Sequence, residues 1–584
     1  MTSYPFNFLS IVVYLLIVLF ISNGIYAPET TAQPNDKLGT GTDGLKYTLI
    51  NKGTEYSVGK GPVKPVGSII VPEYWQGKKV TALSENAFIH CRDLTSIKLP
   101  DSITVIGDFA FMKCTSLEVC NIPKKLVSIG DLAFPFCSEL KDIRLPETLL
   151  AIGDCAFQGC SSLENIILPK SLVKMGTNVF QECTGLRSAT LPENITTINS
   201  YTFLYCTSLA YISIPASVKE IKKSAFEYCS GLTRIELPAL LTSIGERAFC
   251  DCSSLKTIKV PEYITTLGHS IFANCSSLEN VELPNNCTDL GSGIFSGCSR
   301  LKGIRLPDSI TSLPDSAFKD CINLENLVLP ERLIYIGGYV FDGCIRLTTL
   351  KLPETLTAIN EYAFFRWTGL SSIALPKGLV SIDQYAFSGC SNLKNLTLPS
   401  GIKSIAKNAF TQCSSLVKIN IPNSVLTIGG AAFENCVALK EIILPENLKL
   451  IEYSTFASCQ SLERVVIPNG VQKINEDAFF KCVNLKEVVF PVTLTSIGHE
   501  AFSGCSSLAH LDLPKNLGHI GQGSFANCTK LMVITLQSDT PPVLEWGTFD
   551  NCPKMTFIRV PAASLSVYKT NENWALFNQF IESQ

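Results

Sequence analysis

Phenylalanine recurs at a fixed spacing of 23 residues along most of the chain. The series begins at Phe88 and continues to Phe525, which gives twenty positions without an insertion or deletion, and Phe549 follows after a step of 24. A unit of this length cannot bury its own apolar face, so the copies must stack on one another into a solenoid. Although the chain has 584 residues, the repeat therefore predicts one elongated domain rather than several globular ones.

Each unit carries the same pattern of apolar residues around its phenylalanine. A small residue precedes the Phe, a cysteine stands three residues after it, and aliphatic residues stand six, nine and eleven after it, followed by proline. The alternation Ile97-Lys98-Leu99 predicts a short strand of a parallel sheet, with Ile97 and Leu99 pointing inward. Pro100 ends this strand because it has no N–H for the ladder. The fold class predicted is thus a solenoid of about twenty repeats with one parallel sheet face.

Two more aliphatic residues follow the proline, and then commonly a glycine such as Gly107. We interpret this glycine as a turn residue that needs a positive φ, a conformation that Asn and Asp also tolerate. Pro314 occupies the same place in its unit, so the turn there must differ. The non-glycine residues that we expect to substitute are Asn199, Asn360, Asp383 and Asn475.

Opposite charges alternate along the chain at the same spacing of 23 residues. If the strands are parallel and in register, residues 23 apart become neighbours ~4.8 Å from one another, where opposite charges attract. An exposed pair contributes only ~0–1 kcal/mol, so these lines specify register more than stability. The four lines are Glu118, Lys141, Glu164 and Arg187; Lys256, Glu279, Lys302 and Glu325; Glu236, Lys259, Glu282 and Arg305; and Lys418, Glu441, Arg464 and Glu487.

Twenty of the 24 cysteines stand three residues after a phenylalanine of the series. We interpret them as a buried ladder of small side chains with weak S–H donors, mostly reduced because burial raises the thiol pKa. Adjacent units bring these cysteines close enough for disulfides in an oxidising compartment, so pairing stays open. Zinc is less favoured because no CxxC pair occurs. Among the others, Cys155 and Cys250 fall at variable positions where partial exposure is expected.

The two ends of the chain depart from the repeat. An apolar run at residues 9–21, followed by SNGIYA, predicts a signal peptide cleaved after Gly24 or Ala27. The alternative is an uncleaved signal anchor, although spanning a membrane takes ~20 apolar residues. The predicted division is 1–27 signal peptide or anchor, 28–44 linker, 45–82 amino-terminal hairpin cap and degenerate first repeat, 83–536 solenoid, and 537–584 last repeat and helical cap.

The sequence contains no constellation that predicts catalysis. The five histidines stand at different places in their units, and no HExxH, P-loop or GxSxG motif occurs. The net charge of −3 offers no basic field for nucleic acid. We therefore predict a protein that is not an enzyme and binds no cofactor, metal, nucleic acid or small-molecule substrate.

Candidate contact residues come from the outward positions of the predicted strands. Ile443, Val466 and Val489 stand on three successive units, next to Arg464 and, farther along, His510, which predicts an exposed apolar strip rimmed by charge. A covering loop is the alternative. A second candidate is formed by Phe365, Arg366 and Trp367, where tryptophan replaces the ladder cysteine and a bulged turn is expected to push all three outward; mere local irregularity is the alternative. Possible N-glycosylation sites are Asn194, Asn274, Asn286, Asn395 and Asn527.

The phrase LxxIxLPxxLxxIgxxAFxxC, the entry at residues 67–80 and the exit VPAASLSVYKTNENW together resemble the BspA-like, Treponema-type leucine-rich repeat proteins over residues 45–581. The resemblance implies a secreted or surface-exposed protein of bacteria or parasitic protozoa that binds a host or matrix protein or another cell surface. It implies no catalytic residues. Membrane attachment is expected only through the amino-terminal segment, if that segment is uncleaved. The alternative function is a structural spacer or surface-coat component that acts by length and self-association.

Overall fold

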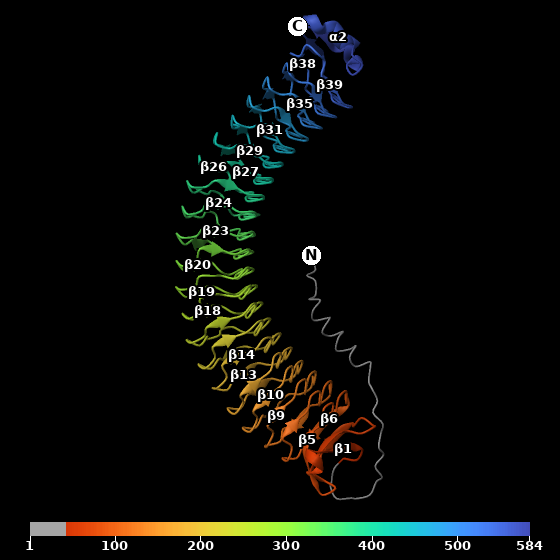
Figure 1. Cartoon of the computed structure of the whole chain (residues 1–584), viewed down its shortest axis with the longest axis vertical. Coiled ribbons are helices and arrows are strands. Elements are labelled where there is room, and N and C mark those ends of the chain that lie inside the picture. The colour runs from red at the N-terminus through yellow and green to blue at the C-terminus, as the bar shows by residue number, and fades with distance from the viewer. Residues whose placement is uncertain (1–41) are drawn as a thin grey trace.

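The computed structural model describes residues 42–584, which form a curved solenoid with one turn of chain stacked on the next (Figure 1). The predicted signal peptide or anchor at 1–27 lies outside the described residues, as does most of the predicted linker. We call each 23-residue turn a rung and name it by its phenylalanine. No helix within 42–584 has both the length and the apolar character needed to cross a membrane.

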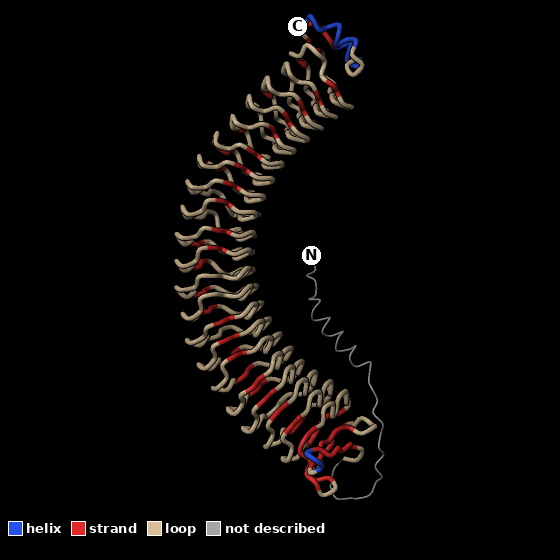
Figure 2. Tube along the Cα trace, viewed as in Figure 1, coloured by secondary structure: helices blue, strands red, loops and turns tan. Residues whose placement is uncertain are grey.

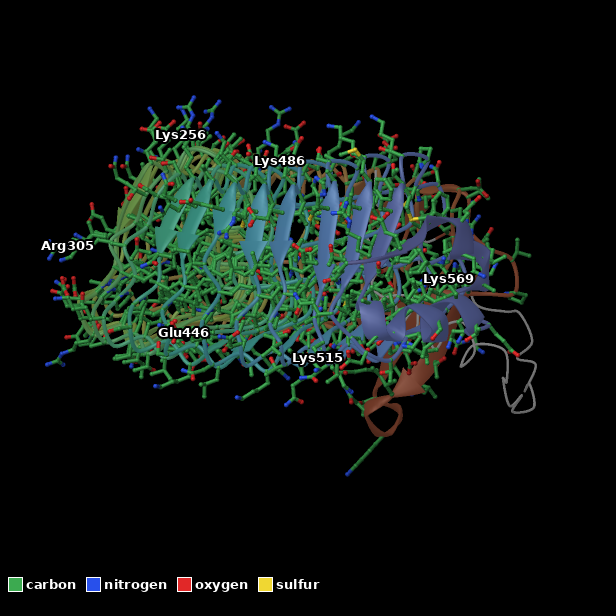
Figure 3. The ribbon with its side chains drawn as sticks, turned by 90° about the horizontal axis from the view of Figure 1, so that it is seen from above. Lys256, Arg305, Glu446, Lys486, Lys515 and Lys569 are labelled. Atoms are coloured by element: carbon green, nitrogen blue, oxygen red, sulfur yellow. The ribbon has the colours of Figure 1, made fainter. Side chains whose placement is uncertain are left out.

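The strand predicted in each unit is present in most rungs and pairs in parallel with the strand of the next rung. Each residue pairs with the residue 23 positions later, as Ile166 does with Ala189. Figure 3 shows these strands lengthwise and side by side, with Arg305 from the end of one strand at the outer edge of the arc. We call them the outer strands. They are β3 (Gly67–Ile70), β6 (Leu94–Lys98), β8 (Val119–Asn121), β11 (Asn165–Ile167), β13 (Ser188–Thr190), β15 (Tyr211–Ser213), β18 (Thr257–Lys259), β19 (Asn280–Glu282), β20 (Gly303–Arg305), β22 (Asn326–Val328), β26 (Asn395–Thr397), β28 (Lys418–Asn420), β30 (Glu441–Ile442), β32 (Arg464–Val466), β34 (Glu487–Val489), β36 (His510–Leu513), β38 (Val533–Leu536), β40 (Phe557–Val560) and β41 (Ile581–Ser583).

A second series of strands, mostly of two residues, was not predicted. Its apolar residue is the second aliphatic after the proline, such as Ile106, which pairs with Ile129 of the next rung. Figure 2 shows both series as short segments separated by turns. The second series is β5 (Lys78–Leu83), β7 (Val105–Ile106), β9 (Ser128–Ile129), β10 (Ala151–Ile152), β12 (Lys174–Met175), β14 (Thr197–Ile198), β16 (Glu220–Ile221), β17 (Ser243–Ile244), β21 (Ser312–Leu313), β23 (Tyr335–Ile336), β24 (Ala358–Ile359), β25 (Ser381–Ile382), β27 (Ser404–Ile405), β29 (Thr427–Ile428), β31 (Leu450–Ile451), β33 (Lys473–Ile474), β35 (Ser496–Ile497), β37 (His519–Ile520) and β39 (Val543–Leu544).

The prediction of a positive φ at Gly107 is wrong, because the left-handed residues lie two before and two after each phenylalanine. In rung 111 they are Phe109 (φ 57°) and Lys113 (φ 58°). A Cβ on Gly107 would instead lie 2.8 Å from the backbone of the preceding rung at Ser84 and Glu85. Glycine is thus needed there for close approach of two backbones rather than for its φ.

The left-handed residues belong to a third set of hydrogen bonds between rungs, which we call the turn ladder. The N–H groups of Phe109, Phe111 and Lys113 donate to the carbonyl oxygens of Asp131, Ala133 and Pro135 at 2.9, 2.6 and 2.9 Å. The left-handed conformation turns these alternate N–H groups toward the next rung. Each rung is therefore tied to its neighbour by the turn ladder as well as by short strands.

The core is a stack of the series phenylalanines, which are fully buried. Except at Phe364, neighbouring rings are nearly parallel, with centroids from 4.9 Å apart for Phe111 and Phe134 to 6.3 Å for Phe318 and Phe341. The ladder cysteines lie beside the stack, and among the described residues every cysteine is free. Burial raises the pKa of the Cys114 thiol to about 12. Cys155 is half-buried, whereas the expectation that Cys250 is partly exposed is wrong, because Cys250 is buried.

Different elements close the two ends of the stack. At the amino end, β1 (Leu45–Ile50) and β2 (Glu55–Lys60) form an antiparallel hairpin through the 3-10 turn η1 (Asn51–Gly53), and β4 (Tyr74–Trp75) pairs with β5. At the carboxyl end lie η2 (Ala562–Ser564), α2 (Leu565–Thr570) and η3 (Ala575–Phe580). Tyr568 and Trp574 are buried there, and the Tyr568 hydroxyl donates to the Ser538 carbonyl oxygen at 2.9 Å.

Candidate functional site

Val466 and Val489 lie on the outer strands β32 and β34, Ile443 directly follows β30, and all three side chains point to solvent. Their exposed fractions are 70%, 43% and 38%, and the Cα atoms of Val466 and Val489 are partners in the ladder. The alternating residues Val465 and Val488 point inward and are buried. No loop covers these three side chains in the described part of the chain, so they form one exposed strip, which we call the apolar strip.

A row of four charged residues runs beside the apolar strip, one on each of four successive rungs. Lys418 pairs with Glu441, and Arg464 pairs with Glu487, each with an N···O distance of 2.8 Å. The Cα atoms of Glu441 and Arg464 are also partners in the ladder. The hydrogen bond from Lys418, with its positive charge, lowers the pKa of the Glu441 carboxyl. These four residues are named the charged row, and His510 stands exposed beyond its end.

The alternation of charge is realised as ion pairs in only some of the predicted lines. Besides the charged row, Lys259 pairs with Glu282 at 3.3 Å. In the line that begins with Lys256, no pair forms between its members within residues 42–584, and Glu325 pairs instead with Arg346 at 2.9 Å. The members of each predicted line stand 23 residues apart, whereas Arg346 stands 21 residues after Glu325, so pairing depends on which rotamers reach across the rungs.

Trp367 lies in the core, and the prediction that a bulged turn pushes it outward is wrong. Its indole Nε1 donates to the carbonyl oxygen of Leu347 at 2.7 Å, and its ring lies 4.6 Å from Phe341 between centroids. The indole occupies more space than a cysteine, and Phe364 stands at 67° to Phe387 instead of parallel to it. Burial removes Trp367 from the candidate contact residues.

The turn ladder is shifted at the same rung. Tyr339 donates to the carbonyl oxygen of Tyr362, and Gly343 to that of Arg366, each one residue farther along than in the other rungs. The outer strands are also interrupted, since only an isolated bridge joins Lys351 to Ala374. We call this interruption between rungs 341 and 364 the seam.

Phe365 and Arg366 differ in exposure, and neither lies in the apolar strip. Phe365 is half-buried and meets Tyr339 and Tyr362 edge-on, at 5.3 and 5.4 Å between centroids. Arg366 is exposed, with its Nε 3.8 Å from Asp342 Oδ1. Tyr362 also stacks on Tyr339 and on Tyr385. Sequence reasoning missed this tyrosine column, although its 23-residue spacing was a readable signal.

One group of three side chains in residues 42–584 has atoms close enough to hold a metal ion: Glu227, Cys250 and Asp251. Arg247 already donates to Glu227 from Nε at 2.8 Å, and the Cys250 thiol donates to Asp251 at 3.0 Å. Burial raises the pKa of Cys250 further from the range in which a thiolate forms. The guanidinium thus already neutralises the carboxylate, and these residues do not fit a metal site.

The asparagines of the predicted glycosylation sequons are all exposed. Asn395 lies on an outer strand, in β26, and Asn274 has a left-handed backbone in the turn ladder. Attachment of a glycan at these side chains would meet no steric block from the core. The other exposed sequon residues are Asn194, Asn286 and Asn527.

Comparison with known proteins gives one family match. The model of the BspA type leucine rich repeat region matches residues 75–186, 128–256, 219–348, 334–463 and 449–573. No curated protein matches the chain.

Among solved structures, a leucine-rich repeat protein from Bacteroides ovatus is 28% identical, with 70% of this chain and 94% of that chain covered and a TM-score of 0.51. The leucine rich repeat protein of T. pallidum is 27% identical, with 37% and 90% covered and a TM-score of 0.31. A leucine rich cell surface protein from Faecalibacterium prausnitzii is 21% identical, with 81% and 94% covered and a TM-score of 0.28.

Proposed function

This chain belongs to the BspA-type leucine-rich repeat family, and from that premise we propose that it is a non-enzymatic, extracellular protein-binding protein. Its relatives are repeat scaffolds, and no catalytic family matches. The apolar strip is the observation that carries the proposal. Three exposed aliphatic side chains on adjacent rungs, rimmed by charge, have the composition of a protein contact rather than of a solvated sheet face.

The strip is held on a rigid support. The backbone of Val466 and Val489 is fixed by parallel pairing, and Val465 and Val488 anchor the same strands in the core. A ligand that binds such a surface pays little for ordering it, because the aliphatic side chains have few rotamers to lose. The partner that we propose is a host or matrix protein or a protein of another cell surface, met by a secreted or surface-held chain.

Binding of the purified chain to matrix proteins and to cells tests the proposal. A triple variant, Ile443→Thr, Val466→Thr and Val489→Thr, is expected to fold, because threonine suits exposed strand positions and none of the three points inward. It should lose most of the binding. The matched control changes Ile167→Thr and Val328→Thr, two exposed aliphatics at the same place in other outer strands but without apolar neighbours. Unaltered binding by the triple variant would exclude the strip as the site.

A further inference from the structure

The charged row reads plus, minus, plus, minus in the order Lys418, Glu441, Arg464, Glu487. Within the chain the first two and the last two are paired at 2.8 Å, and all four side chains are more than half exposed. Each therefore retains room for a second partner of opposite sign. On the same four rungs the neighbouring outward positions hold Asn420 and the apolar strip.

This order is self-complementary under one two-fold rotation. An axis parallel to the strands, between β30 and β32, brings a second copy face to face with its rung order reversed. Lys418 then lies opposite Glu487 of the second copy, and Glu441 lies opposite Arg464 of the second copy. Across the same axis, Ile443 lies opposite Val466 of the second copy, and Val466 lies opposite Ile443 of the second copy. Opposite charges face one another along the whole row, and Val489 lies opposite Asn420 of the second copy.

We propose that the apolar strip and charged row also bind a second copy of this chain. The inference rests on the proposed protein-binding function of this surface and adds a further partner to it. Because the outer strands run across the plane of the arc, the axis leaves both molecules in one plane, back to back (Figures 1 and 3). Their outer faces curve away from each other on both sides, so the contact is confined to a few rungs. Contacts of such limited area belong to the weak, reversible class.

Sedimentation of the full chain over a range of concentrations tests the proposal, and charge variants identify the surface. The all-positive variant, Glu441→Lys with Glu487→Lys, should associate at least about tenfold more weakly, because like charges then face each other. The inverted variant, Lys418→Glu, Glu441→Lys, Arg464→Glu and Glu487→Lys, keeps every pair within the chain and the self-complementary order. It should associate with itself as the wild type does, yet not with the wild type. All variants keep the same amino-terminal residues, so a difference in association between variants comes from the substituted charges.

Energy transfer in a mixed sample, with one fluorescent label on the wild type and another on the inverted variant, measures whether the two associate. Self-association of the wild type and of the inverted variant, with no association between them, supports the proposal. A chain that stays monomeric at millimolar concentration, or an inverted variant that mixes freely with the wild type, overturns it. Binding to matrix proteins is measured on the same samples. If that binding persists in a monomeric chain and is lost in the triple threonine variant, the proposed function stands and only the second copy is excluded as partner.

Discussion

The Cys114 thiol donates a hydrogen bond to the carbonyl oxygen of Phe88 on the preceding rung, with Sγ and O 3.1 Å apart. The same bond recurs along the ladder, for example from Cys436 to Phe410 and from Cys505 to Phe479. Each such carbonyl also accepts a backbone N–H, as Phe88 does from Cys91. The cysteine is therefore a donor of the right size for a narrow site and not merely a small apolar residue.

We predict that the protein loses stability in alkaline solution. An unfolded cysteine ionises near 9.0, whereas burial raises the pKa of Cys114, Cys160 and Cys482 to about 12. Between these pH values the unfolded chain releases thiol protons that the folded chain retains, so rising pH favours unfolding. The contribution is complete below pH 9 and is lost toward pH 12. Denaturant unfolding followed by circular dichroism should show the decline, and replacing these three cysteines by alanine should make it shallower.

We predict that the ladder thiols are reduced in the folded protein and that all of them except the half-buried Cys552 are unreactive. The buried ladder sulfurs are hidden from reagents, and their raised pKa values leave almost no thiolate at neutral pH. The half-buried Cys155 and Cys552 should react first, although burial raises the pKa of each to about 11. Thiol counting before and after denaturation measures both groups. Recovery of fewer than half of the ladder thiols would mean that the rungs are cross-linked.

Phe249→Ala should cost ~3–5 kcal/mol of the free energy of unfolding, because a fully buried ring leaves a cavity. Its ring stacks 5.4 Å from Phe226 and 6.0 Å from Phe272, so those rungs lose their contacts. Hydrogen exchange should therefore rise most in the adjoining rungs and little at the far ends. An equal rise along the whole solenoid would contradict this nearest-neighbour description.

Trp367→Ala should also destabilise the protein by ~3–5 kcal/mol, because it removes a buried indole and its hydrogen bond to Leu347. The exposed neighbour Arg366 provides the control, and Arg366→Ala should change the free energy of unfolding little. Denaturant unfolding measures both. Equal effects of the two substitutions would show that the indole contributes no more than a surface side chain.

The repeat made the architecture predictable from sequence, and the limits of that prediction lie in particular residues. Ile166 and Ala189 pair as their 23-residue spacing requires, because one period fixes strand, stacking and register together. The role of Gly107 was predicted wrongly, because the sequence does not distinguish a glycine required for close approach of two backbones from one required for positive φ. The left-handed positions hold residues as different as Phe109 and Lys113, so composition could not reveal them.

In the candidate site, too, one feature was predictable from the sequence and another was not. The exposure of the apolar strip followed from strand alternation, which is a local property. The orientation of Trp367 depended on whether the neighbouring rungs could shift to admit an indole, and the shifted bonds at Tyr339 and Gly343 show that they do. That accommodation is a property of packing between rungs, which no pattern within one repeat encodes.

The turn ladder also gives the molecule a dipole moment along the solenoid. Its N–H groups point toward the carboxyl-terminal end, so three peptide groups in each rung, of ~3.5 D apiece, align head to tail along the solenoid. The negative end lies at the first rung, where the Lys60 ammonium donates to the Ile89 carbonyl oxygen at 2.6 Å. Two such dipoles lying side by side attract when they point in opposite directions. The back-to-back arrangement with reversed rung order satisfies that condition.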